Sequence, residues 1–65
     1  MQIMINQRPF ELLQGASLDD ALEAFAAHPP FAAAVNGVFV AQRDYPQHLL
    51  KDGDYIDVVQ PVMGG

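Results

Sequence analysis

The stretch Gly15–Pro30, GASLDDALEAFAAHPP, carries the strongest secondary-structure pattern in this 65-residue chain. Its apolar residues recur at i, i+3, i+4 and i+7, which places them in one stripe of a helix: Leu18, Ala21, Leu22 and Phe25. Ser17 stands where the first turn needs a cap, and Asp20, three positions later, completes a capping box. Pro29 and Pro30 are expected to end the helix, because the residue before a proline avoids helical angles. The pattern predicts one amphipathic helix whose stripe must pack on another element.

The residues before this helix predict a hairpin of two strands. MQIMIN (residues 1–6) alternates, with Ile3 and Ile5 on one face and Gln2 and Met4 on the other. The segment from Asn6 to Pro9 is a turn candidate, because Asn and Pro suit turn backbones. FELLQ (residues 10–14) is then expected to return as the second strand.

The residues after the helix predict a second hairpin and a final strand. FAAAV (31–35) and VFVAQ (38–42) flank Asn36-Gly37, a favoured two-residue turn, although the pattern does not decide the faces of Phe39 and Val40. RDYPQHLL (43–50) is expected to be a loop with one short helical turn, and KDGD (51–54) is a turn signal. The last strand alternates, with one set of residues facing inward (Ile56, Val58) and one facing outward (Tyr55, Asp57, Val59), and its pairing is expected to end near Pro61.

This order of elements predicts an α+β domain in which one main helix packs on one face of a mixed sheet. Such an arrangement, with the helix crossing between the second strand and the later ones, is the ubiquitin-like β-grasp. The domain is expected to span residues 1–61, followed by a flexible tail of residues 62–65. We expect these residues in the core: Ile3, Ile5, Leu22, Phe25, Ile56 and Val58.

Composition excludes several classes of protein. The chain has no cysteine, so neither a disulfide nor a thiolate metal site stabilises it. Its formal net charge is -5, with Arg8, Arg43 and Lys51 as the basic residues, which argues against binding to nucleic acid or to an anionic membrane. It suits a partner with a basic surface. No apolar run reaches membrane-spanning length, and a cytoplasmic protein is expected.

Candidate catalytic and metal-binding residues all have a simpler structural interpretation. Ser17 is better explained as a helix cap than as a nucleophile, and the pair His28 and His48 matches no known ligand spacing. Asp52-Gly-Asp54 is a fragment of a calcium loop without its other ligands. The carboxylates near the start of the helix suit its dipole and a solvated face: Asp19, Asp20 and Glu23. The sequence thus predicts no metal site, no permanently bound cofactor and no self-contained catalytic apparatus.

The whole chain resembles the ThiS/MoaD family of sulfur carriers, and the most specific part of the resemblance runs from Ala34 to Gly65. AVNGVFV (34–40) is similar to the family's opening of the middle hairpin, and LLKDGDYIDVVQPVMGG (49–65) is similar to its Gly-Asp turn, final strand and terminal diglycine. The short length and the QHLLKDGD approach resemble ThiS more than MoaD. One departure is Val40-Ala41-Gln42, where ThiS sequences commonly have Val-Pro followed by Arg or His; here Arg43 comes one place later.

This resemblance implies that Gly65 is the reacting residue and that the protein is a co-substrate of partner enzymes rather than an enzyme. A ThiF-like enzyme would use ATP and magnesium to adenylate the Gly65 carboxylate. A sulfur donor protein would then supply the sulfur of a thiocarboxylate, and a ThiG-like thiazole synthase would receive it for thiamine biosynthesis. Gly64 and Gly65 lack a Cβ, so such a tail can thread a narrow channel.

Partner contacts are expected on the outward side of the sheet and along the tail: Met4, Val59, Pro61, Val62 and Met63. Three other functions stay open at this point. The chain could be a MoaD-like carrier for molybdopterin synthesis, a ubiquitin-like protein modifier, or a β-grasp adaptor that binds without reacting. Lys51 is the single lysine, which restricts branched self-conjugates and disfavours the modifier. The sequence does not identify the immediate sulfur donor or the oligomeric state.

Overall fold

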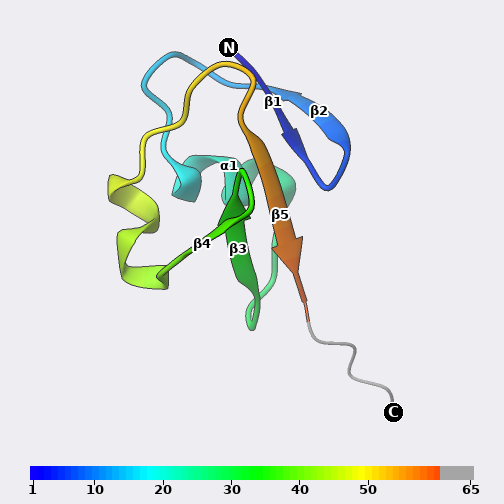
Figure 1. The fold of residues 1–65 in the computed structure, drawn as a ribbon, viewed down its shortest axis with the longest axis vertical. Coiled ribbons are helices and arrows are strands. Elements are labelled where there is room, and N and C mark those ends of the chain that lie inside the picture. The colour runs from blue at the N-terminus through cyan, green and yellow to red at the C-terminus, as the bar shows by residue number, and fades with distance from the viewer. Residues whose placement is uncertain (61–65) are drawn as a thin grey trace.

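A computed structural model describes residues 1–60, in which five strands form one mixed sheet (Figure 1). The elements in chain order are β1 (Gln2–Ile5), β2 (Arg8–Glu11), α1 (Leu18–Phe25), β3 (Ala32–Val35), β4 (Val38–Val40), the 3-10 helix η1 (Gln42–Gln47) and β5 (Tyr55–Val59). The strand order is β2-β1-β5-β3-β4. The β1–β5 pair is parallel, and the other pairs are antiparallel. Helix α1 lies behind the sheet in Figure 1, so the predicted β-grasp arrangement is confirmed.

The capping box of α1 forms as the sequence predicts. The Asp20 N–H donates to Ser17 Oγ at 3.1 Å, and the Ser17 N–H donates to Asp20 Oδ2 at 2.9 Å. The predicted end of the helix is wrong, because α1 stops at Phe25 and not at the prolines. Ala26 adopts left-handed angles (φ 62°) and its N–H bonds back to carbonyls of the last turn, which closes the helix. His28 therefore lies beyond the last helical turn.

The first hairpin turns earlier than the sequence predicts. Asn6 and Gln7 form its two-residue turn with φ of 49° and 69°, the positive values that a tight hairpin requires. Strand β2 consequently starts at Arg8 and ends at Glu11, so the expected strand over residues 10–14 is shifted. Pro9 fits inside β2 because this strand lies at the edge of the sheet, where a missing N–H costs no ladder bond.

The core lies between α1 and the face of the sheet that it covers. Five of the six expected core residues are buried: Ile3, Ile5, Leu22, Ile56 and Val58. Phe25 is only partly buried and packs against this core, with its ring edge-on to that of Phe10 at 6.0 Å between centroids. As the last residue of α1, Phe25 packs beside the edge strand β2 and not beneath the centre of the sheet.

Candidate functional site

Strand β5 lies in the middle of the sheet and leads directly to the C-terminal residues (Figure 1). Its start is fixed by a small network of side chains. Asn36 Oδ1 accepts from the Tyr55 N–H at 2.9 Å, and Asn36 Nδ2 donates to Asp54 Oδ1 at 3.0 Å. The other carboxylate oxygen of Asp54 accepts from the Lys51 N–H at 2.8 Å. The two stretches that resemble the family, residues 34–40 and 49–65, thus meet at the start of β5. Asn36 from the first and Asp54 from the second bond to each other there and hold β5 in register.

Asp54 is 7% exposed, and each of its carboxylate oxygens already accepts a protein hydrogen bond. Asp52 Oδ1 accepts from the Gln2 N–H at 2.7 Å. These bonds explain the Asp-Gly-Asp sequence as a structural turn. Across residues 1–60, no group of three or more His, Cys, Asp and Glu side chains is placed to hold a metal ion.

The other proposed chemical residues are not brought together into a site. Ser17 is buried and its hydroxyl is engaged in the helix cap. His28 lies in the loop after α1, whereas the His48 carbonyl accepts from the Leu18 N–H at the opposite end of the helix. None of the helices in residues 1–60 has the length and apolar character needed to cross a membrane.

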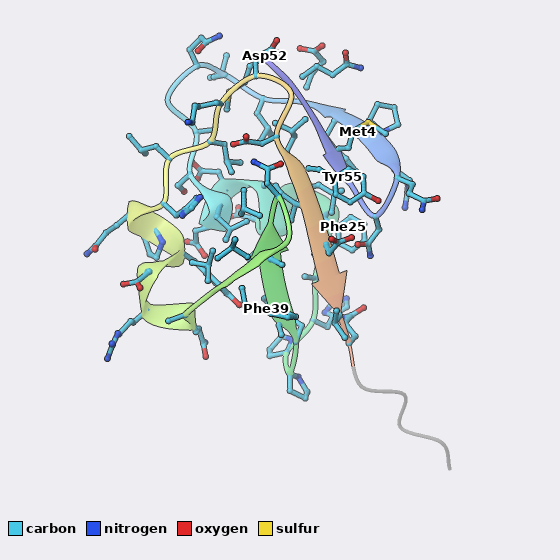
Figure 2. The ribbon with its side chains drawn as sticks, in the orientation of Figure 1. Met4, Phe25, Phe39, Asp52 and Tyr55 are labelled. Carbon is cyan, nitrogen blue, oxygen red and sulfur yellow. The ribbon has the colours of Figure 1, made fainter. Side chains whose placement is uncertain are left out.

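The face of the sheet turned away from α1 carries several apolar side chains. The strand registers pair Met4 with Tyr55 on this face. They also pair Phe39 with Ala34, and Val59 with Ala32, on the same face. Phe39 is 66% exposed and Val59 is 53% exposed, whereas Met4 and Tyr55 are partly buried. We call Met4, Phe39, Tyr55 and Val59 the outer patch; the first three come from strands β1, β4 and β5 and are labelled in Figure 2.

The outward positions predicted for Met4 and Val59 are confirmed, while their role in partner binding stays a prediction. The sequence analysis placed Tyr55 outward without naming it as a partner contact, and it left the face of Phe39 undecided. The two-residue turn could have located Phe39, because it pairs Val35 with Val38 and therefore Ala34 with Phe39. Val40 consequently faces the core, against which it packs.

The point where the chain leaves the sheet adjoins the outer patch. Val59 ends β5, and the side-chain Nε2 of the next residue, Gln60, donates to the His28 carbonyl at 3.0 Å. The predicted site residues Pro61, Val62, Met63, Gly64 and Gly65 lie outside the described residues, as does the predicted domain boundary.

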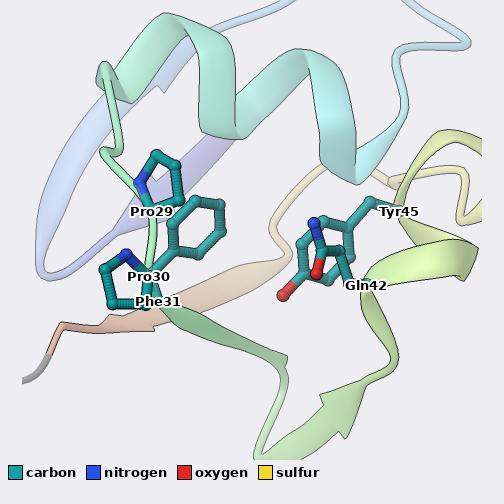
Figure 3. Close-up of a pocket in the computed structure, with 5 residues that line it drawn as sticks. All are labelled: Pro29, Pro30, Phe31, Gln42 and Tyr45. Carbon is teal, nitrogen blue, oxygen red and sulfur yellow. The ribbon is translucent and has the colours of Figure 1, made fainter.

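A pocket of about 360 Å³ lies between the start of β3 and η1 (Figure 3). Its lining residues are Pro29, Pro30, Phe31, Gln42 and Tyr45. The rings of Phe31 and Tyr45 are nearly parallel, with centroids 6.0 Å apart. None of the five carries a formal charge at neutral pH, so the pocket offers apolar contact and not a carboxylate or imidazole base.

The departure from the ThiS pattern falls at the start of η1. Ala41 caps this 3-10 helix, and Gln42 and Arg43 form its first two residues. Arg43 lines a shallow surface hollow together with Ala41, Gln42 and Pro46. Arg43, the basic residue nearest to this departure, thus lies on η1.

Comparisons with known proteins converge on one family. The model of the ThiS family matches residues 3–65. The chain is 37% identical over 67 residues to a molybdopterin synthase sulfur carrier subunit from Chlamydomonas reinhardtii, a match covering 94% of this chain and 81% of that protein. It is 32% identical over 66 residues to the sulfur carrier protein ThiS of Escherichia coli K12, with both chains fully covered.

Solved structures support the fold independently of these sequence matches. A crystal structure of the thiamine biosynthesis protein ThiS from Geobacter metallireducens superposes with a TM-score of 0.81 at 19% identity, and both chains are fully covered. A solution NMR structure of a thiamine biosynthesis protein from the same organism gives a TM-score of 0.76 at 20% identity, covering this chain fully and 87% of the other. At such identities the likeness establishes the β-grasp fold.

Proposed function

Because the chain belongs to the ThiS family of sulfur carriers, we propose that its Gly65 carboxylate carries sulfur for the thiazole of thiamine. A ThiF-like enzyme adenylates this carboxylate, a sulfur donor protein supplies the sulfur, and a ThiG-like thiazole synthase receives it. The protein acts as a co-substrate of these enzymes and binds no permanent cofactor. The observation that carries the proposal is the extent of the family match, which runs through both terminal glycines to residue 65.

The chemistry requires activation from outside the chain. A carboxylate is ionised at neutral pH and is a poor electrophile. One oxygen of the Gly65 carboxylate attacks the α-phosphorus of ATP, and pyrophosphate leaves. Hydrosulfide, the form in which the donor releases its sulfur in this scheme, then attacks the carbonyl carbon, AMP departs with that oxygen, and loss of the sulfur's proton leaves a thiocarboxylate. The adenylating enzyme supplies the magnesium and the cationic groups that offset the developing phosphate charge.

The outer patch supports a carrier that docks before it reacts. Its exposed apolar residues, Phe39 and Val59, lie on the uncovered face of the sheet. Because they stay largely in contact with water there, they add little to the stability of the domain alone. Asp57 lies on the same face, beside Ala34 in the strand register, and the chain as a whole is acidic. A partner surface with an apolar centre and a basic surround would complement both features.

A MoaD-like role in molybdopterin synthesis is the second candidate. The observation that favours it is the 37% identity to the algal molybdopterin synthase sulfur carrier subunit, which exceeds the 32% identity to E. coli ThiS. The full mutual coverage with E. coli ThiS and the match to the ThiS family model favour thiamine. Restored growth without thiamine of an E. coli strain lacking ThiS supports the first role. Restored molybdoenzyme activity in a strain lacking the molybdopterin carrier supports the second.

The direct test of carrier chemistry uses intact-protein mass spectrometry. The full chain is incubated with its cognate adenylating enzyme, ATP, magnesium and sulfide. We expect the mass change of one oxygen replaced by sulfur, located at Gly65 by fragmentation, and no change when ATP is omitted. If the chain forms an amide with lysines of other proteins and no thiocarboxylate, it is a modifier. If its mass never changes, the adaptor function takes the place of the carrier.

A further inference from the structure

We propose that Asn6 is a positioning residue, whose side chain fixes the direction in which β5 delivers the reactive tail. This inference rests on the proposed function, because a direction of delivery matters only if the tail reacts. It is drawn from the hydrogen bonds at the C-terminal end of β5.

Strand β1 supports β5 along only part of its length. The Met4 N–H donates to the Asp54 carbonyl at 3.0 Å, and the Asn6 N–H donates to the Ile56 carbonyl at 2.9 Å. The chain then turns back into β2, because Asn6 adopts left-handed angles (φ 49°). From Val58 onward, β5 would have no strand neighbour on this side.

The Asn6 side chain takes the place of the missing strand. Its Oδ1 accepts from the Val58 N–H at 2.8 Å, and its Nδ2 donates to the Val58 carbonyl at 3.1 Å. In a parallel ladder, the next bonds would come from the carbonyl of one residue of β1 and the N–H of the residue two places on. One amide side chain supplies both bonds and so extends the sheet beyond the end of β1.

On its other side, toward β3, strand β5 is also bonded as far as its C-terminal end. Val59 pairs with Ala32 of β3, and Gln60 Nε2 donates to the His28 carbonyl at 3.0 Å. The last residues before the tail are therefore fixed on both sides, with Asn6 as the support on the β1 side. Fixing Val58 and Gln60 limits the directions in which the chain can leave the sheet, and catalysis depends on how reacting groups are oriented.

Asn36 provides a matched control within the same chain. It too is an asparagine with positive φ (51°) in a hairpin turn, and its Oδ1 also accepts from a backbone N–H of β5. That bond is to Tyr55, at the opposite end of the strand from the tail. Asn6→Gly and Asn36→Gly each remove one such side chain while keeping a residue that favours left-handed angles.

The experiment compares these two variants by amide hydrogen exchange and by thiocarboxylate formation with the cognate adenylating enzyme. In Asn6→Gly, we expect the Val58 N–H to exchange about tenfold faster. We also expect kcat to fall about tenfold with KM nearly unchanged, because the outer patch is intact. Asn36→Gly removes the bonds to Tyr55 and Asp54 at the start of β5 and leaves those at its tail end, so we expect faster exchange at Tyr55 and a smaller fall in kcat than in Asn6→Gly. If the Asn6→Gly variant fails to fold, Asn6→Asp tolerates the same angles, keeps an acceptor for the Val58 N–H and replaces the donor by a charged oxygen that faces the Val58 carbonyl, so it should also lower kcat at unchanged KM.

Three outcomes would overturn the inference. They are an unchanged Val58 exchange rate, a wild-type kcat in the Asn6 variants, or an equal loss of kcat in Asn36→Gly, which would indicate a general effect of destabilisation. If the unsubstituted chain itself forms no thiocarboxylate, the proposed function fails and the inference falls with it. If the unsubstituted chain reacts and the Asn6→Gly variant matches it, only the positioning role is wrong.

Discussion

Both faces of the sheet carry apolar residues, yet only one of them is covered by α1. On the face beneath α1, Ile3, Ile5 and Ile56 are fully buried. On the opposite face, Phe39 and Val59 remain more than half exposed. Burial of apolar surface accounts for the residues of the first face, since it is the main favourable contribution to folding. It does not account for Phe39 and Val59, and recognition of a partner at the outer patch stays a prediction.

The largest effect is expected on the covered face. Ile56 pairs with both Ile5 and Val35 at the centre of the sheet and has no exposed surface. We expect Ile56→Ala to lower the free energy of unfolding by about 2–5 kcal/mol, through lost apolar burial and the cavity left behind. Urea unfolding followed by circular dichroism measures this loss. A change below about 1 kcal/mol would contradict the assignment of this face as the core.

A smaller effect, confined to binding, is expected on the uncovered face. The double variant Phe39→Thr, Val59→Thr keeps strand-forming residues and removes apolar surface from the outer patch. We expect an affinity for the adenylating enzyme about tenfold lower, measured by calorimetry, with stability changed by less than about 1 kcal/mol. Leu13→Thr is the control, because Leu13 is 85% exposed and lies outside the sheet. An equal loss of affinity in the control would remove the distinction between the outer patch and the rest of the surface.

The features that depend on near neighbours were predictable from the sequence. The capping box needs only Ser17 and Asp20, and the turn at Asn36-Gly37 needs only its own two residues. The alternation of β5 assigned Ile56 to the core and Val59 to the outer face. Each of these predictions rests on chemistry within a few residues of the chain.

The features that depend on distant contacts were not predictable. Pro9 suggested a turn, but it lies in β2, because an edge strand tolerates a residue without an N–H. The end of the helix is a local feature, but it was not predictable either. Ala26 closes the helix by adopting left-handed angles, and nothing in the segment AFAA (24–27) indicates this. The two hydrogen bonds of Asn6 join residues 52 positions apart. For the predicted tail sites, including Gly64 and Gly65, the sequence and the family match remain the basis of the assignment.

Deletion of Gly65 tests the central claim most directly, namely that residues 1–60 fold and dock while the terminal carboxylate reacts. The truncated chain should unfold at nearly the same temperature as the full chain, because exposed termini tolerate truncation. In a reaction with adenylating enzyme, ATP, magnesium, sulfide, thiazole synthase and the carbon and nitrogen substrates of that synthase, the full chain should support thiazole formation and the truncated chain should support none. If the folded, truncated chain supports thiazole formation as well as the full chain does, Gly65 is not the sulfur-carrying residue and the protein is an adaptor.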